Sequence, residues 1–239
     1  MRNALIAMSF IGSGGLTVTA CGTPDYQYAG FRTYEHFPLD GLKREWLYKH
    51  QDKDFLMKVE KLPDPAAMGS KRIHTLRYAQ EDPYKLLYSI KWSSDSTDGV
   101  EIHGYMVEEN ADLGGDGSAG DDGGGDTDTG AAGVDVVTGQ WVEFSPPLQL
   151  TEFQMAPGEQ VVSSGGGVDY TTTFENMEGC PNDWRADWEC MKIVIESSEA
   201  DPAPFVGTWH WATRFGTSLF QPQGENFPWT LVTADYVAD

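Results

Sequence analysis

Apolar and polar residues alternate with a period of two in many short segments of this chain of 239 residues. The clearest segment spans residues 86–92, where Leu86, Tyr88, Ile90 and Trp92 occupy every second position. Successive side chains of a strand point to opposite faces of a sheet, so this pattern indicates a strand with one buried face. Because no segment shows a long helical period, the sequence predicts a mainly β fold.

The same alternation continues in residues 100–106, where Val100, Ile102 and Met106 form the predicted apolar face. The opposite face of this segment carries Glu101, His103 and Tyr105. Residues 94–99 (SDSTDG) have the composition of a turn and predict a hairpin between the two segments. Similar patterns predict further strands at 45–50, 55–62, 72–79, 141–144, 168–175, 188–196, 207–215 and 229–237.

The predicted strands are short and are joined by turns rich in Gly, Pro, Asp and Ser. Such spacing is typical of antiparallel architectures. We therefore expect one domain over residues 36–239, formed by an antiparallel curved sheet that is either a half-barrel or a sandwich. Residues 110–133 should interrupt it, since they hold nine Gly, six Asp and no aromatic residue and cannot form a core. The alternative for this Gly/Asp-rich insert is a weak calcium loop at 126–130 (DTDTG), although it lacks the full EF-hand ligand set.

The first 20 residues resemble a bacterial signal peptide: Arg2 is followed by an apolar stretch and by the small residues Val18, Thr19 and Ala20. Cys21 stands where a lipobox requires it, so we expect cleavage before Cys21 and lipidation of its thiol. Acyl chains would then hold the protein to a membrane, with residues 21–35 as a tether. The alternatives are a signal peptide cut without lipidation and a transmembrane anchor, for which residues 4–20 are barely long enough.

Two cysteines remain after Cys21, and an exported chain favours a disulfide between them. Cys180 and Cys190 flank a turn at 181–183 (PND), so the bond would close a hairpin. A metal site is the alternative, but His210 is the nearest histidine in the sequence.

The net charge of −21 excludes nucleic acid as a partner, because such a field repels phosphate backbones. Sequence motifs of catalysis or metal binding are also missing. The five His residues form no H-x-H or H-E-x-x-H motif, and no G-x-S-x-G follows a strand. We therefore expect a protein that is not an enzyme and that uses no metal or cofactor.

Aromatic residues concentrate in the last third of the chain, around the two cysteines. In a continuous strand at 207–215, Trp209, Trp211, Thr213 and Phe215 would share one face. These rings either pack in the core or line an apolar groove for a lipid, peptide or glycan. The candidate groove residues are Trp188, Trp209, Trp211, Phe215 and Trp229.

Residues 37–48 (FPLDGLKREWLY) resemble the opening strand of β-rich lipoproteins of Gram-negative bacteria, particularly myxobacteria. Residues 145–148 (SPPL), 155–159 (MAPGE), 188–194 (WECMKIV) and 209–220 resemble later landmarks of that family. The family is similar in architecture to the LolA and LolB lipoprotein carriers, whose curved sheet wraps an apolar cavity. Since Gly22 follows Cys21, resemblance to enterobacterial sorting rules implies the outer membrane.

Two functions follow as expectations. The first is a noncatalytic, membrane-anchored lipoprotein of the cell envelope, with a structural role or an envelope protein as partner. The second is a periplasmic carrier for a lipid or other apolar ligand, which needs an internal cavity of several hundred Å³. An enzyme would instead need polar groups that converge in a pocket.

Overall fold

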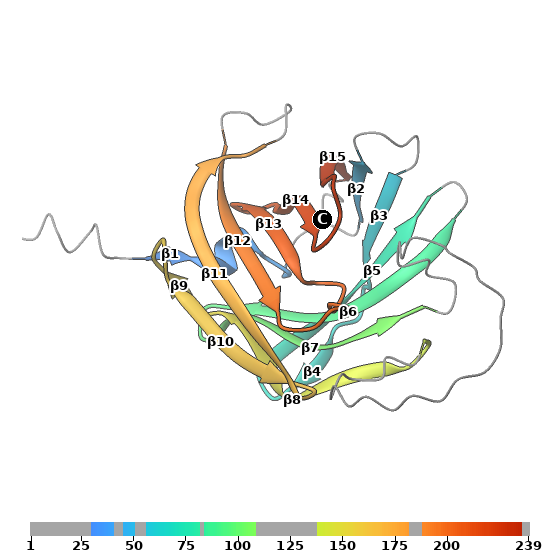
Figure 1. Ribbon diagram of the computed structural model, residues 1–239, viewed down its shortest axis with the longest axis horizontal. Coiled ribbons are helices and arrows are strands. Elements are labelled where there is room, and N and C mark those ends of the chain that lie inside the picture. Colours follow the sequence, from blue (N-terminus) through green and yellow to red (C-terminus); the bar gives the residue numbers. More distant parts are fainter. Residues whose placement is uncertain are drawn as a thin grey trace, which may run out of the picture.

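The computed structural model describes residues 30–40, 45–50, 56–81, 84–108, 138–181 and 188–235. The predicted mainly β fold is confirmed. Thirteen strands form an antiparallel sheet that is nearly closed and barrel-like (Figure 1). The leader, Cys21 and the insert at 110–133 lie outside the described residues, so the predictions for them stay predictions. The described part of the chain contains no helix that is long and apolar enough to cross a membrane.

The strands follow the order β10-β11-β12-β13-β14-β15-β2-β3-β5-β6-β7-β8, and β4 pairs with β5 at the side of this path. Their bounds are β2 (Glu45–His50), β3 (Leu56–Lys61), β4 (Ala66–Met68), β5 (Lys71–Gln80), β6 (Lys85–Asp95), β7 (Gly99–Val107), β8 (Trp141–Thr151), β10 (Gln160–Gly165), β11 (Val168–Gly179), β12 (Glu189–Ser197), β13 (Gly207–Ala212), β14 (Gly216–Pro222) and β15 (Trp229–Asp235). The predicted hairpin at 94–99 is confirmed, because Asp95 of β6 pairs with Gly99 of β7.

The sheet comes closest to closure where β8 approaches β10, the two strands at the ends of the order (Figure 1). The Ser163 hydroxyl of β10 donates a hydrogen bond of 2.7 Å to the Gln149 carbonyl of β8. Gly165 provides room for a ring on the opposite strand, since a Cβ there would lie 2.5 Å from Phe144. A side chain at position 165 would therefore separate the two strands.

An N-terminal strap, residues 30–40, covers part of the interior before the sheet begins. It contains β1 (Phe31–Arg32), which pairs with β9 (Gln154–Met155), and the one-turn helix α3 (Thr33–His36). Beyond α3, Phe37 and Leu39 are buried in the core. Residues 30–35 of the expected tether thus belong to the fold.

The interior is filled by apolar side chains from all around the sheet. Phe37 of the strap lies between two rings from distant strands, with its centroid 4.8 Å from both Trp92 and Trp211. A second group of rings fills the space on the side of β7, β8 and β11, namely Tyr105, Phe144, Tyr170 and Phe205. Close packing of such rings buries a large apolar area, which stabilises the sheet.

Candidate functional site

The two central tryptophans of the predicted groove lie inside the core. Trp209 is 1% exposed; its ring stacks on Phe220 at 3.8 Å between centroids and meets Trp92 edge-on at 5.9 Å. Its Nε1 donates a hydrogen bond of 2.9 Å to the Phe205 carbonyl. Trp211 is equally buried and contacts Phe37. In this conformation neither ring is accessible to a ligand.

The prediction that Trp209, Trp211, Thr213 and Phe215 share one face of a strand is wrong. Strand β13 ends at Ala212, and Arg214 adopts a positive φ of 68° in the turn to β14. The turn redirects the chain, so Phe215 leaves the main core.

Phe215 and Trp188 belong to a smaller apolar cluster around the disulfide. The predicted bond between Cys180 and Cys190 is present, and both cysteines are buried. The Trp188 ring lies 4.0 Å from the ring of Phe215. Trp229 lies elsewhere, on β15, where it meets His50 edge-on at 5.0 Å. The five predicted residues thus occupy three places, and a ligand-binding role for them stays a prediction.

The structure leaves a small gap beside the N-terminal strap. Its volume is about 20 Å³, which is room for about one water molecule. Leu39 of the strap, Tyr48 of β2 and Phe220 of β14 are among the side chains that line it. A gap of this size is far smaller than the several hundred Å³ that a lipid or a drug-sized ligand occupies.

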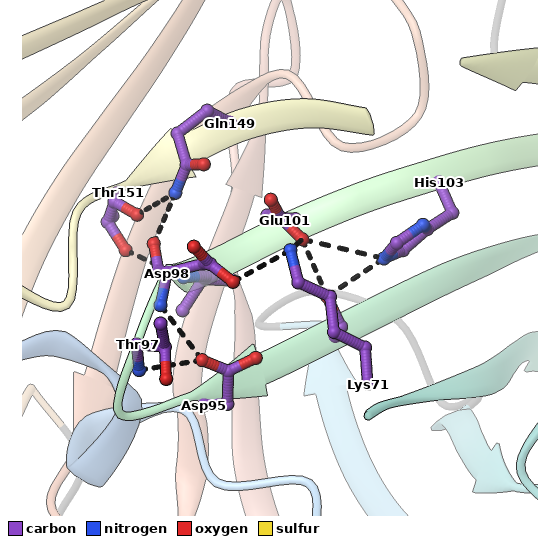
Figure 2. Close-up of polar contacts among 10 residues, drawn as sticks. Lys71, Asp95, Thr97, Asp98, Glu101, His103, Gln149 and Thr151 are labelled. Carbon is purple, nitrogen blue, oxygen red and sulfur yellow. Dashed lines mark hydrogen bonds and ion pairs between the residues drawn. The ribbon is translucent and has the colours of Figure 1, made fainter. Parts of the chain in front are cut away.

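A polar cluster on β5, β6 and β7 is the strongest candidate for a chemically active site among the described residues (Figure 2). It consists of Lys71, Ser93, Asp98, Glu101 and His103, and we call it the outer cluster. Ser93, Glu101 and His103 are all buried.

A β-bulge at His103 creates this arrangement. On β7, Gly104 pairs with Lys91 and Ile102 pairs with Trp92, so His103 is an extra residue in the ladder. Bulges change the direction in which side chains point and recur beside functional sites. The bulge also shifts the alternation: Tyr105 enters the core and Met106 is only half-buried. The prediction that Met106 shares the apolar face and Tyr105 the polar face is therefore wrong.

Lys71 links two carboxylates of the outer cluster. Its Nζ lies 2.7 Å from Glu101 Oε2 and 2.9 Å from Asp98 Oδ2 (Figure 2). Burial acts to lower the pKa of the Lys71 ammonium, but its hydrogen bonds to Glu101 and Asp98 outweigh burial, and the pKa is raised. Lys71 therefore stays charged and compensates the buried carboxylate of Glu101, as buried charges require.

Ser93 and His103 resemble part of a hydrolytic triad in their distance alone. His103 Nε2 lies 2.8 Å from Ser93 Oγ, but the Ser93 hydroxyl donates its proton to Glu101 Oε2 at 3.1 Å. The network then requires Nε2 to carry a proton and donate it to Ser93, so this nitrogen is no base for the hydroxyl. Glu101 also approaches the same nitrogen, at 3.7 Å, whereas the acid of a triad contacts the other one.

The environment of His103 keeps its ring neutral. Burial lowers the pKa of His103, and the opposing effect of Glu101, which raises it, is smaller. Ser93 is 1% exposed, so a substrate has no access to the hydroxyl in this conformation. The outer cluster thus has the properties of a satisfied polar network that stabilises the sheet.

The hairpin beside the outer cluster is fixed by side-chain bonds to its backbone. Asp95 Oδ1 accepts hydrogen bonds from the amides of Thr97 and Asp98 at 2.7 and 2.8 Å (Figure 2). Gln149 of β8 donates to the carbonyls of Asp98 and Thr151. These contacts hold Asp98 in place to pair with Lys71.

Sequence reasoning missed the outer cluster because its residues are typical of an exposed strand face. The bulge at His103 brings these residues together, but a bulge cannot be seen in the alternation of apolar and polar residues along the sequence.

Within the described residues, no three His, Cys, Asp or Glu side chains come together in a way that could hold a metal ion. No protein-family model, curated protein or solved structure matches this chain.

Proposed function

We propose that the protein is a noncatalytic lipoprotein of the cell envelope that acts through its surface as a structural or binding module. Acyl chains on Cys21 anchor it to a membrane, and the resemblance to enterobacterial sorting rules favours the outer membrane. The filled interior is the observation that carries this proposal. Phe37, Trp209 and Trp211 occupy the space that a carrier would keep for its ligand. The lipobox before Cys21 supports the location.

The outer cluster supports a noncatalytic role. Its serine donates to a carboxylate instead of to a histidine, and its charges are compensated by Lys71. A catalytic site needs a reactive group that a substrate can reach and a base that can take up its proton. Ser93 meets neither condition.

Titration with an apolar fluorescent probe, N-phenyl-1-naphthylamine, tests the proposal against the carrier. A filled interior predicts no saturable increase in probe fluorescence with the folded protein. The matched variant is Phe37→Ala, which opens a cavity of about the size of one ring beside Trp92 and Trp211; it should take up benzene, seen as a rise in Tm, but not the larger probe. Saturable uptake by the unmodified protein, at one probe per chain, would instead support a carrier.

A further inference from the structure

The surface where the N-terminal strap leaves the fold carries two exposed phenylalanines. Phe31 of β1 is 38% exposed and Phe153, which precedes β9, is 44% exposed. Three phenylalanines are exposed among the described residues, and the third is Phe227. Two of the three therefore gather at the point where the described chain begins.

Backbone contacts join the two segments that carry these phenylalanines. Phe31 pairs with Met155, and the Thr33 amide donates to the Phe153 carbonyl at 3.1 Å. The Thr33 hydroxyl donates to the Glu152 carbonyl at 2.6 Å. One edge of the Phe31 ring is supported by Phe174 of the core, at 5.7 Å between centroids. Phe31 and Phe153 thus lie on paired backbone segments where the strap begins, and we call the surface that carries these two exposed side chains the strap surface.

The number of residues between the lipid and the fold determines which surface faces the membrane. Nine residue steps separate Cys21 from Gly30, and a fully extended chain covers about 30 Å over that distance. A domain of this size has a radius of gyration of about 17 Å and is about 43 Å across as a sphere. Gly30 would therefore lie within about 30 Å of an anchored Cys21, a distance shorter than the breadth of the domain.

Gln154 fixes the exit point of the chain. Its side-chain amide donates to the Gly30 carbonyl at 2.7 Å. Gly30 also lies so close to β9 that a Cβ there would be 2.6 Å from the Met155 carbonyl group. The chain therefore cannot leave the fold at another place without breaking these contacts.

The charges beside the strap surface indicate which lipid it tolerates. Arg32 and Glu35 neutralise each other in an ion pair of 3.0 Å. Glu152, next to Phe153, is exposed and adds a carboxylate to the rim of this surface. A carboxylate repels anionic head groups, whereas Phe is among the apolar side chains that interfacial segments bury at the bilayer surface.

We propose that the strap surface docks on the lipid bilayer, with Phe31 and Phe153 inserted among zwitterionic head groups. The inference rests on the proposed lipid anchor at Cys21, which brings this surface to the membrane. The anchored domain then has one fixed orientation, with β1 and β9 toward the lipid; β15, which pairs with β2, lies apart from these two strands (Figure 1).

The test uses the full, lipidated protein reconstituted into phosphatidylcholine vesicles. Cysteine is introduced at one position at a time as Phe31→Cys, Phe153→Cys or Phe227→Cys, and is labelled with the polarity-sensitive dye NBD. Phe227 is the matched control because it is 39% exposed and precedes β15. Arg32→Cys adds a position on the strap surface whose side chain is 61% exposed and does not pack in the core.

We expect dye emission at 31, 32 and 153 to shift to the blue and to be quenched by doxyl-labelled lipid. Dye at 227 should keep its aqueous spectrum, and anionic phosphatidylglycerol should reduce the shift at 153. Protein that floats with the vesicles but gives equal signals at 153 and 227 would overturn the strap surface alone. Protein that does not float and carries no acyl mass would overturn the proposed anchor, and the orientation with it.

Discussion

Replacement of Trp209 by alanine tests whether the interior is as tightly filled as the structure shows. The ring is 1% exposed and stacks on Phe220 at 3.8 Å. Removal of a buried Trp or Phe ring costs about 3 to 5 kcal/mol when the cavity cannot collapse. The Phe205 carbonyl also loses its donor, at a cost of about 1 kcal/mol. We therefore expect a loss of about 4 to 6 kcal/mol in the free energy of unfolding.

Urea denaturation followed by far-UV circular dichroism, without reductant, measures this loss. Trp209→Phe is the intermediate variant, because it keeps one six-membered ring but loses Nε1 and two ring carbons; it should cost less than Trp209→Ala. Trp141→Ala is the surface control. Trp141 is half-buried under Lys91, with Nζ 4.0 Å from the ring, and its loss should cost about 1 kcal/mol. If Trp209→Ala cost no more than Trp141→Ala, the filled interior would be refuted.

Three further predictions concern the disulfide, the insert and the histidines. The double variant Cys180→Ser, Cys190→Ser should lower the free energy of unfolding by roughly 2 to 3 kcal/mol. The disulfide joins residues ten positions apart, and its loss restores that loop-closure entropy to the unfolded chain. An unchanged urea midpoint would contradict this. Replacement of residues 110–133 by a short Gly-Ser turn should barely change Tm. The Gly139 amide already donates a hydrogen bond to the Val107 carbonyl, and the entropy of loop closure varies slowly with loop length. A large fall in Tm, or a rise in Tm when calcium is added to the intact protein, would show a structured insert. Burial lowers the pKa of four histidines in the folded protein. As pH falls below about 6.5, the unfolded chain therefore binds protons before the folded protein does, and the free energy of unfolding should decrease. This decrease should end below the pKa values that these histidines have in the folded protein. The four are His36, His74, His103 and His210. In scanning calorimetry, His103→Asn should weaken this pH dependence, and an equal slope in the variant would contradict the assignment.

The strands were predictable where one face is apolar and the other polar. The segments at 45–50 and 72–79 correspond closely to β2 and β5, because a half-buried strand leaves a direct trace in the alternation. Strand β10 was missed, since Ser163, Ser164 and Gly165 have the composition of a turn and form a strand only through pairing with β11. Tertiary pairing overrides local preference there.

The bulge at His103 and the burial of the strap could not be predicted for a different reason. A bulge depends on how β6 and β8 pair with β7, and such long-range registers are not encoded in any local window. Phe37 and Leu39 lie in an irregular segment, so no period marks them as core residues. The disulfide was predictable because its chemistry leaves few choices once export is assumed.

The mature N-terminus is the most direct test of a lipid-anchored envelope protein. The measurement is the intact mass and terminal-peptide mass of protein extracted with detergent from membranes of a Gram-negative expression host, beside a Cys21→Ser variant. The account predicts a mature chain that begins at Cys21 and carries acyl chains on it, and a Cys21→Ser variant that carries none. A soluble product that begins at another residue, or a membrane-bound chain that retains residues 1–20 without acyl mass, would contradict it.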